Sequence, residues 1–130
     1  MSAEHHLHNA YREWRRLAEA EGEAIRARNW MLVCDCQSAL KKLQPDIIRF
    51  TGEAQLEWAG PGVDRAAKEN DVRETVKSLI ELEWRNHSLL EVRRKNAAAE
   101  FEELNRARHD LRRVQRSYAP GRPSDWSSFS

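Results

Sequence analysis

Apolar residues recur at helical spacing along two long stretches of the chain. The first stretch runs from Leu7 to Leu43, with apolar positions separated by three, four or sums of three and four. The second runs from Asp71 to Tyr118, and its apolar positions are Val72, Val76, Leu79, Leu90, Ala97, Phe101, Leu104, Leu111 and Tyr118. Such spacing aligns side chains along one face of an α-helix. The pattern therefore predicts an all-α protein built on long helices.

Three local signals interrupt this pattern. Gly22 costs about 1 kcal/mol relative to Ala inside a helix, but we expect the first helix to continue through it. Pro45 predicts either a kink at Gln44 or a stop and a restart, so that residues 46–58 form a continued or a short second helix. The run Ala-Gly-Pro-Gly at residues 59–62 is the clearest loop. The expected fold is a long antiparallel helical hairpin, resembling a coiled coil, with a kink or an extra short helix after Pro45.

The second arm of this hairpin begins at about Arg65 or Asp71 and ends at Tyr118. A helix of that size spans roughly 70–80 Å, at 1.5 Å per residue. It cannot be stable alone with an apolar stripe exposed, so we expect it to pair with the first arm. The last residues are rich in Pro, Gly and Ser and have the composition of a linker. The sequence predicts a single helical domain over residues 1–118 and a flexible tail over 119–130.

Polar residues interrupt the apolar face of both arms, at Glu21, Glu83, Asn86 and Arg93. Polar groups on a helix seam fix the register of the helices or keep a groove available to a partner. The alternative is a set of catalytic groups inside a bundle. A carboxylate metal site in a helix bundle would need a Glu-x-x-His motif, which the chain lacks. We therefore expect a binding protein, with no enzymatic activity and no cofactor.

The composition limits the classes of partner. Charged residues make up 33% of the chain, with both signs interleaved and a net charge of +1. This balance suits long solvated helices and drives no association with nucleic acid or membrane. No apolar stretch reaches the length of a membrane span, and no signal peptide follows Met1, so we expect a soluble, cytoplasmic protein. Cys34 and Cys36 are expected to be reduced thiols that pack as small apolar residues.

Two clusters could carry chemistry, and a simpler interpretation is favoured for each. The arginines of residues 106–116 have no interleaved aromatic residues and match no nucleic-acid motif, and the end of a helix favours cations in any case. His5, His6 and His8 lie with Glu4 in a terminal segment that we expect to fray, whereas structural metal sites need four fixed ligands. We expect neither a nucleic-acid partner nor a metal site.

Several short motifs occur in a suggestive order. They are Glu21-x-x-Ala24-Ile25, Asn29-Trp30, Cys36-Gln37, Leu40, Leu43 and Pro45 in the first arm, then Asn86-x-x-Leu89-Leu90 with Arg93 or Arg94, and finally Tyr118-x-x-Gly121. In this order and spacing the chain resembles the FlgN family of flagellar export chaperones, to which the FliT group is similar in architecture. The resemblance covers about residues 14–121. Asn29 departs from it, since the family usually has an acidic residue there.

The resemblance implies a function without catalysis or cofactor. FlgN-like proteins bind the C-terminal amphipathic helix of hook–filament junction proteins, and FliT-like proteins do the same for the filament cap protein. They keep these subunits unassembled and deliver them to the export apparatus. The chain is thus expected to be a chaperone of flagellar export.

The end of the second arm supplies a candidate binding stripe. Its expected partner-binding residues are Leu104, Ala107, Arg108, Leu111, Val114, Tyr118, Trp126 and Phe129. Apolar side chains at this spacing can hold an amphipathic helix. Five arginines between residues 106 and 116, against the single acid Asp110, suit a partner with acidic residues beside its apolar face.

Two alternatives stay open for this stripe. Trp126 and Phe129 are either disordered or folded back into the groove until a partner arrives, and we favour the second arrangement. The stripe itself either binds a partner or pairs two copies of this chain as a structural, self-associating coiled coil. Both uses need an exposed apolar face, so the sequence does not separate them.

Overall fold

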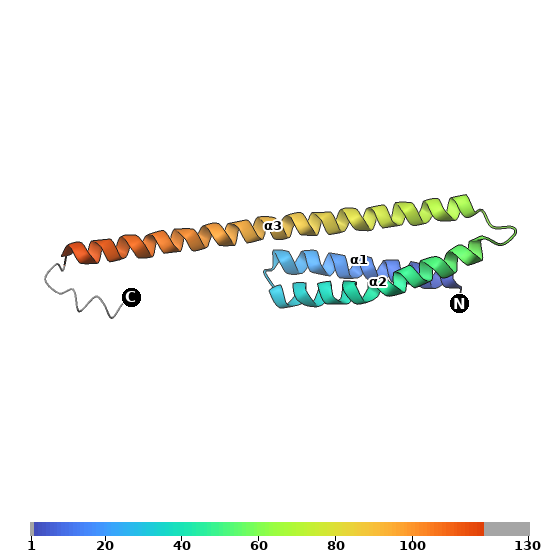
Figure 1. Ribbon diagram of the computed structural model, residues 1–130, viewed down its shortest axis with the longest axis horizontal. Helices are drawn as coiled ribbons and strands as arrows, with labels where there is room; N and C mark the ends of the chain where they lie inside the picture. Colours follow the sequence, from blue (N-terminus) through green and yellow to red (C-terminus); the bar gives the residue numbers. More distant parts are fainter. Residues whose placement is uncertain (1, 119–130) are drawn as a thin grey trace. The chain divides into compact units, whose positions relative to one another are not determined.

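The structure is a computed structural model, and it describes residues 2–118. Three α-helices follow one another along the chain (Figure 1): α1 (Ala3–Arg26), α2 (Trp30–Trp58) and α3 (Arg65–Tyr118). No strand occurs within the described residues. The all-α class predicted from the apolar spacing is therefore confirmed.

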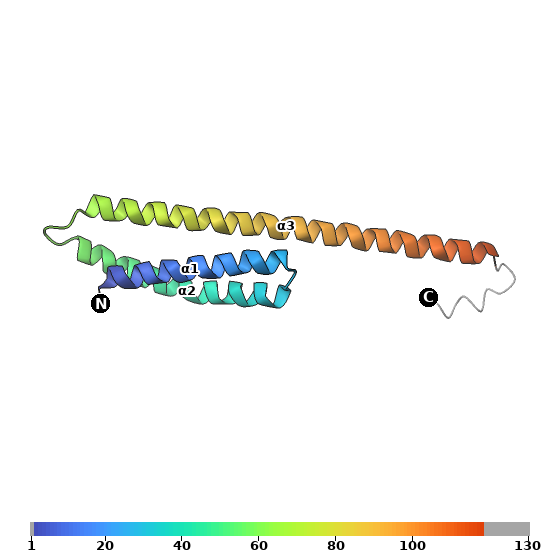
Figure 2. The ribbon, with the colours of Figure 1, turned by 180° about the vertical axis from the view of Figure 1, so that it is seen from behind.

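The chain divides into two compact units, Met1–Glu91 and Val92–Ser130. The first unit contains α1, α2 and the part of α3 up to Glu91. In both ribbon views α1 and α2 lie side by side and antiparallel, and this part of α3 runs alongside them (Figures 1 and 2). The first unit is thus a bundle of three helical segments. The second unit contains the rest of α3, from Val92 to Tyr118.

The first arm is not one continuous helix, contrary to the expectation. The helix breaks at residues 27–29. There the backbone amide of Asn29 donates to the carbonyl of Ala24 (2.9 Å), and the backbone amide of Arg28 donates to the carbonyl of Ile25 (3.1 Å). Arg28 has a φ of 57°. This is a Schellman ending, and the Asn29 side chain then caps α2 by accepting from the amide of Leu32 (3.2 Å). The expected long first arm is therefore itself a hairpin of two helices.

The other local signals have mixed outcomes. The helix does continue through Gly22, as expected. Of the two outcomes expected at Pro45, the restart is wrong, because α2 includes Pro45 and runs unbroken to Trp58. The predicted loop at residues 59–62 lies between α2 and α3. Asp64 ends this loop as the cap of α3, because its carboxylate accepts from the amide of Ala67 at 3.1 Å.

Two groups of buried apolar side chains hold the first unit together. The larger group includes Leu7 of α1, Trp58 of α2 and Leu79 of α3. The smaller group lies beside the α1–α2 turn and includes Ile25 and Val33. Burial of each such side chain stabilises the folded state by about 1.5–3 kcal/mol. Because all three helices contribute, none of them is dispensable to this core.

The start of α1 is anchored, contrary to the expectation that the terminal segment with His5, His6 and His8 frays. Helix α1 begins at Ala3, whose amide donates to a carboxylate oxygen of Glu57 at 2.7 Å. The side chain of Ser2 caps α1 by accepting from the amide of His5 at 3.2 Å. Glu4 accepts a hydrogen bond from the Lys68 ammonium at 2.7 Å, which joins the start of α1 to the start of α3. Contacts to α2 and α3 therefore fix this end.

Candidate binding surfaces

The C-terminal stripe is the apolar face of α3 in the second unit, formed by Leu104, Ala107, Leu111, Val114 and Tyr118. All five are exposed, and among the four larger side chains the exposed fraction lies between 50% for Val114 and 86% for Tyr118. Phe101, one turn earlier, is also exposed. An exposed apolar face of this length is a feature of surfaces that bind another helix.

The arginines expected beside the C-terminal stripe are exposed, but few of them lie next to it. At the period of an α-helix, Arg108 lies on one side of the stripe and Asp110 on the other, and Arg113 and Arg116 lie on the opposite face of α3. Arg113 pairs with Asp110, with 3.2 Å between the guanidinium and the carboxylate. Arg108 shows no ion pair within residues 2–118, so it is a positive charge beside the stripe that an acidic partner can meet. Trp126 and Phe129, the other two predicted binding residues, lie outside the described residues.

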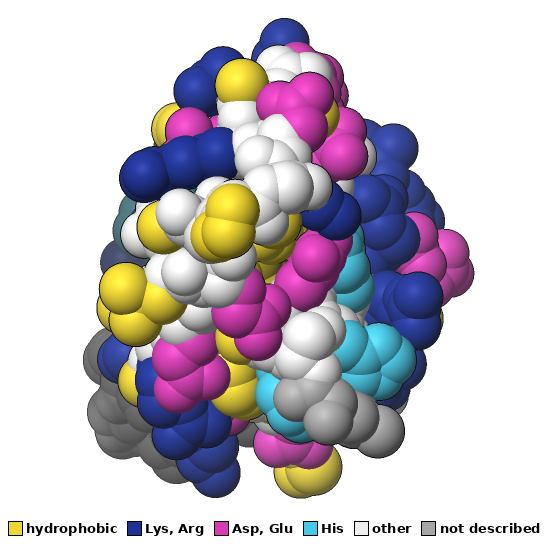
Figure 3. All heavy atoms as spheres, turned by 90° about the vertical axis from the view of Figure 1, so that its right-hand side faces the viewer, with side chains coloured by type: hydrophobic (Ala, Val, Ile, Leu, Met, Phe, Trp, Pro, Cys, Tyr) yellow, Lys and Arg dark blue, Asp and Glu magenta, His cyan; other side chains and the backbone are white. Residues whose placement is uncertain are grey.

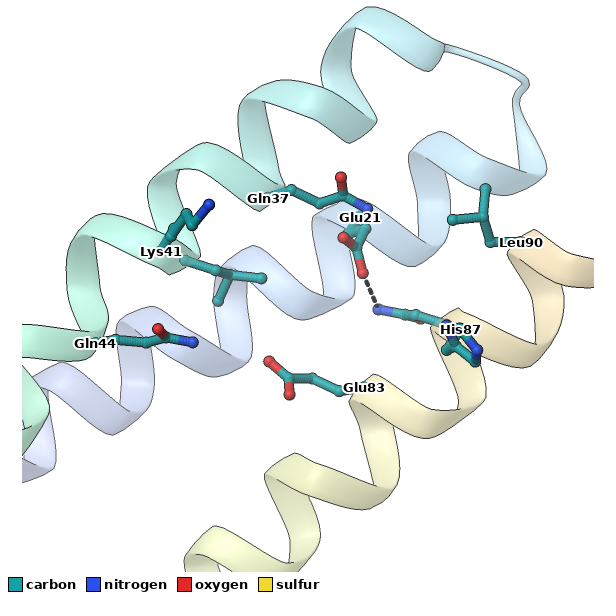
Figure 4. A pocket seen from close by; sticks show the side chains of 9 residues that line it. Glu21, Gln37, Lys41, Gln44, Glu83, His87 and Leu90 are labelled. Atoms are coloured by element: carbon teal, nitrogen blue, oxygen red, sulfur yellow. Dashed lines mark hydrogen bonds between the residues drawn. The ribbon is translucent and has the colours of Figure 1, made fainter.

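The first unit contains a separate cleft with a volume of about 280 Å³. It is lined by residues of all three helices: Glu21 of α1, Gln37, Leu40, Lys41 and Gln44 of α2, and Glu83, Asn86, His87 and Leu90 of α3. Figure 4 shows the Glu21 and Glu83 carboxylates directed into this space from α1 and α3. The cleft is thus lined by two acidic groups together with the polar side chains of Gln37, Lys41 and Gln44.

Asn86 is the most buried polar residue of the cleft, with 2% of its surface exposed. Its side-chain nitrogen donates to the carbonyl of Ala18 at 2.6 Å and to the Glu21 carboxylate at 3.1 Å. Both partners are acceptors, so the orientation of the amide follows from the hydrogen bonds. The predicted positions of Glu21 and Asn86 on the buried seam are thereby confirmed.

Gly22 makes room for this contact. A Cβ atom at Gly22 would lie 2.7 Å from the side-chain oxygen of Asn86. Any larger residue would displace Asn86 from its two acceptors. The glycine inside α1, which costs helix stability locally, is therefore explained by the close approach of a side chain from α3.

The Glu83 carboxylate, on α3, is held by a side chain of α1. The indole nitrogen of Trp14 donates to it at 2.8 Å. Both residues also line a smaller cavity of about 50 Å³, together with Leu43 and Ile47 of α2. Trp14, Glu21, Glu83 and Asn86 form what we call the polar layer. Arg93, the fourth polar residue predicted on the seam, belongs to the second unit.

The polar layer has the properties of a structural element. The carboxylates of Glu21 and Glu83 each accept a hydrogen bond from a neighbouring helix, from Asn86 and Trp14 respectively. Such pairings satisfy groups that would be costly to bury alone. These hydrogen bonds favour one register of α1 against α3. This agrees with the interpretation, made from the sequence, that polar residues on the seam fix the register of the helices.

One exposed apolar surface was not predicted. Ile80, Trp84 and His87 of α3, with Glu83, line a shallow hollow of about 340 Å³, and the Trp84 and His87 rings meet edge to face at 6.0 Å. Trp84 is 65% exposed. The number of tryptophans in the chain was a general signal for an interface. The apolar spacing alone did not single out Trp84, because it lies off the buried face.

The structure also places the histidines and cysteines considered from the sequence. Among residues 2–118, no group of three metal-binding side chains is found, and His8 instead lies 3.6 Å from the carboxylate of Glu4. Cys34 is exposed, so only Cys36 packs as a small apolar residue, and burial raises the pKa of its thiol. The end of the first unit that carries the α2–α3 loop shows acidic, basic and histidine side chains intermixed with isolated apolar ones (Figure 3).

None of the helices within residues 2–118 combines the length and the apolarity that a membrane crossing requires.

The comparisons with known proteins identify no relative of this chain. No protein-family model, no curated protein and no solved structure matches the chain.

Proposed function

We propose that this protein binds an amphipathic helix of a partner on the C-terminal stripe, and that the partner is a secreted flagellar protein. The observation that carries the proposal is the exposure of the whole stripe, from Leu104 to Tyr118, on a regular helix. The flagellar context comes from the resemblance of the chain to export chaperones. As such a chaperone, the protein keeps its partner unassembled before export.

The geometry of the stripe suits a helix as the bound element. The spacing of three and four residues between Leu104, Ala107, Leu111, Val114 and Tyr118 repeats the spacing of a coiled-coil seam. Ala107 is the small position within it, where the larger side chain of an opposing helix can approach. Leu104 and Leu111 then provide apolar area on either side of this gap.

The charges beside the stripe define the chemistry of the partner. Arg108, next to the stripe, shows no ion pair within the described residues. An acidic side chain next to the apolar face of the bound helix would meet it. Such complementarity raises the rate of association and selects against partners with basic borders.

A binding experiment tests this proposal with a fluorescently labelled peptide from the C-terminal helix of a hook–filament junction protein. Leu111→Asp places a charge in the middle of the stripe, and we expect the dissociation constant to rise at least about tenfold, which corresponds to roughly 1.4 kcal/mol. Fluorescence anisotropy measures the change. Ile48→Asp is the matched control, because Ile48 is equally apolar and exposed on α2.

Three outcomes are informative. Loss of binding only in Leu111→Asp, with unchanged helix content by circular dichroism, supports the proposal. Equal binding by both variants would place the partner on another surface. Absence of binding by the unchanged protein, both to this peptide and to the corresponding segment of the filament cap protein, would overturn the flagellar assignment.

A further inference from the structure

The two carboxylates that face the cleft of the first unit have no cation beside them. Glu21 is only 8% exposed, and Glu83 is half-buried. Figure 4 shows both carboxylates directed into the cleft, one from α1 and the other from α3. Among residues 2–118 neither of them forms an ion pair. Buried carboxylates are normally paired with a cation. The cleft thus holds negative charge that no group of the described chain neutralises.

The hydrogen bonds of the polar layer leave part of each carboxylate available. Asn86 donates to one oxygen of Glu21, and Trp14 donates to one oxygen of Glu83. The second oxygen of each group accepts no hydrogen bond from residues 2–118. An ionised carboxylate can accept about four hydrogen bonds. One oxygen of each group therefore fixes the helix register, and the other is free to accept from a ligand in the cleft.

Lys41 also lines the cleft, but it does not neutralise these groups. Its side chain is exposed on α2, and it forms no ion pair within the described residues. An exposed lysine gains little from pairing, because its ammonium group is strongly hydrated and ordering the long side chain costs entropy. The two carboxylates are therefore accessible to a cation from solution.

The other lining residues define the kind of cation. Leu40 and Leu90 offer apolar contacts, and Gln37 and Gln44 offer further hydrogen-bond acceptors. The volume of about 280 Å³ suits a single small group or side chain. A guanidinium presents several N–H donors in one plane and is weakly hydrated, so it can pair with acceptors on different helices. An ammonium group concentrates its donors at one point and is harder to dehydrate.

We propose that this cleft binds a guanidinium group carried on a short aliphatic chain. Glu21 and Glu83 pair with the guanidinium, while Leu40 and Leu90 contact the aliphatic chain. The chemistry is the same for a free guanidino compound and for an arginine side chain of a bound protein. The proposal does not depend on the proposed function, because the cleft lies in the first unit and the C-terminal stripe in the second.

An NMR titration of the full chain tests the proposal with two probes. The first is butylguanidine, and the second is a short alanine peptide with one central arginine. The indole N–H resonance of Trp14 is the readout, because this group donates to Glu83 inside the site. Trp14→Phe identifies the resonance. The same peptide with citrulline in place of arginine is the matched control, since citrulline keeps the shape and removes the charge.

The two probes distinguish the sources of the guanidinium. A saturable shift with butylguanidine and none with the peptide would identify a site for free guanidino compounds. Tighter binding of the arginine peptide would identify a site for a protein side chain. Either result supports the proposal. Absence of a saturable shift with both probes, or equal binding of the citrulline peptide, would overturn it.

Substitutions in the cleft locate the binding. Glu83→Gln removes the charge and keeps an oxygen that can accept from Trp14, so we expect the dissociation constant to rise about tenfold, as a loss of roughly 1.4 kcal/mol would. Glu21→Gln should have the same effect from α1. Glu81→Gln is the control, because it removes a charge from an exposed position of α3. An equal loss with Glu81→Gln would show that the probes respond only to net charge and would reject the site.

Lys41→Gln keeps the test decisive if either glutamate variant fails to fold. It removes a positive charge from the rim, so the probes should bind a few times more tightly, and weaker binding would contradict the proposal. The flagellar peptide should bind Glu83→Gln as it binds the unchanged protein. Failure of the guanidinium site and failure of the C-terminal stripe are therefore separate results.

Discussion

The two units use the same helical pattern in opposite ways. Leu79, in the first unit, is completely buried against α1 and α2, whereas Leu111, on the same helix in the second unit, is 57% exposed. Both belong to the repeating apolar face of α3. The periodicity therefore identifies the face that can be covered, but only the presence of neighbouring helices decides whether it forms a core or an interface.

The polar residues show a second difference between the units. In the first unit, Asn86 and Glu21 are buried and bonded to each other, so that polarity fixes the register of helices within one chain. In the second unit, charges such as Glu102 and Arg112 lie exposed on α3. There polarity faces solvent and fixes no internal contact. Buried polar groups thus specify internal packing, whereas these exposed charges do not contribute to it.

Replacement of a leucine in each unit gives the largest expected difference. Leu79→Ala leaves a cavity in the core and should reduce the free energy of unfolding by about 2–5 kcal/mol. This loss should be the same at every protein concentration, because all partners of Leu79 belong to its own chain. Leu111→Ala should change the free energy of unfolding by only about 0.5 kcal/mol or less, because Leu111 is 57% exposed.

Urea denaturation followed by circular dichroism at low and high protein concentration measures both effects. Leu56→Ala on α2 serves as the control for an exposed leucine outside the second unit, since Leu56 is 78% exposed. A concentration-independent loss for Leu111→Ala as large as that for Leu79→Ala would show that the stripe packs within its own chain. The contrast between the two units would then disappear.

The contact between Gly22 and Asn86 predicts an effect of intermediate size. Gly22→Ala adds a methyl group 2.7 Å from the Asn86 oxygen. Overpacking of this kind costs about 1–3 kcal/mol, which exceeds the gain of about 1 kcal/mol from replacing a helical glycine with alanine. We therefore expect a net loss of stability in chemical denaturation, although alanine is the better helix former.

A double-mutant cycle separates the two contributions. Asn86→Ala alone should cost about 1–3 kcal/mol, because it leaves the Ala18 carbonyl and the Glu21 carboxylate without their donor. In that background the same change at Gly22 should become neutral or stabilising, since the remaining neighbour, Arg26, would lie at an ordinary 3.6 Å. An equal loss in both backgrounds would mean that Asn86 does not explain the glycine.

Helix class and seam positions were predictable from the sequence, because they depend on local spacing. The break at residues 27–29 was not, since its left-handed position is occupied by Arg28 and not by a glycine. The available signal was Asn29, whose side chain caps α2. Because the apolar spacing continues on both sides of Asn29, it predicted one continuous helix. At Pro45 only the restart, one of the two expected outcomes, is wrong, because a helix that packs on its neighbours can include one proline.

The candidate site was predictable in part. The apolar spacing located the C-terminal stripe, and the exposure of Leu104, Leu111 and Tyr118 agrees with a surface role. The contact of Trp14 with Glu83 and the fit of Asn86 to Gly22 were not predictable. They join residues more than 60 positions apart, and such a contact follows only from the way the helices pack.

The smallest expected effect concerns the anchor at the start of the first unit. The hydrogen bond from Lys68 lowers the pKa of the Glu4 carboxyl below its ordinary value, with a further contribution from Trp58. A lowered pKa in the folded state means that the stabilisation is present above the ordinary glutamate pKa. It is lost as the pH falls through the lowered value, when the carboxylate becomes protonated.

Glu4→Gln should therefore lower the melting temperature slightly at neutral pH and leave it unchanged in acid, once Glu4 of the original protein is also neutral. The effect is small because both side chains are partly exposed and screened by solvent. Glu19→Gln, which removes an exposed charge from the same helix, controls for net charge. Because Lys68 lies in the first unit, the difference should be independent of protein concentration. A difference that grew with concentration would connect the N-terminal anchor to association, and the first unit would then not be a self-contained bundle.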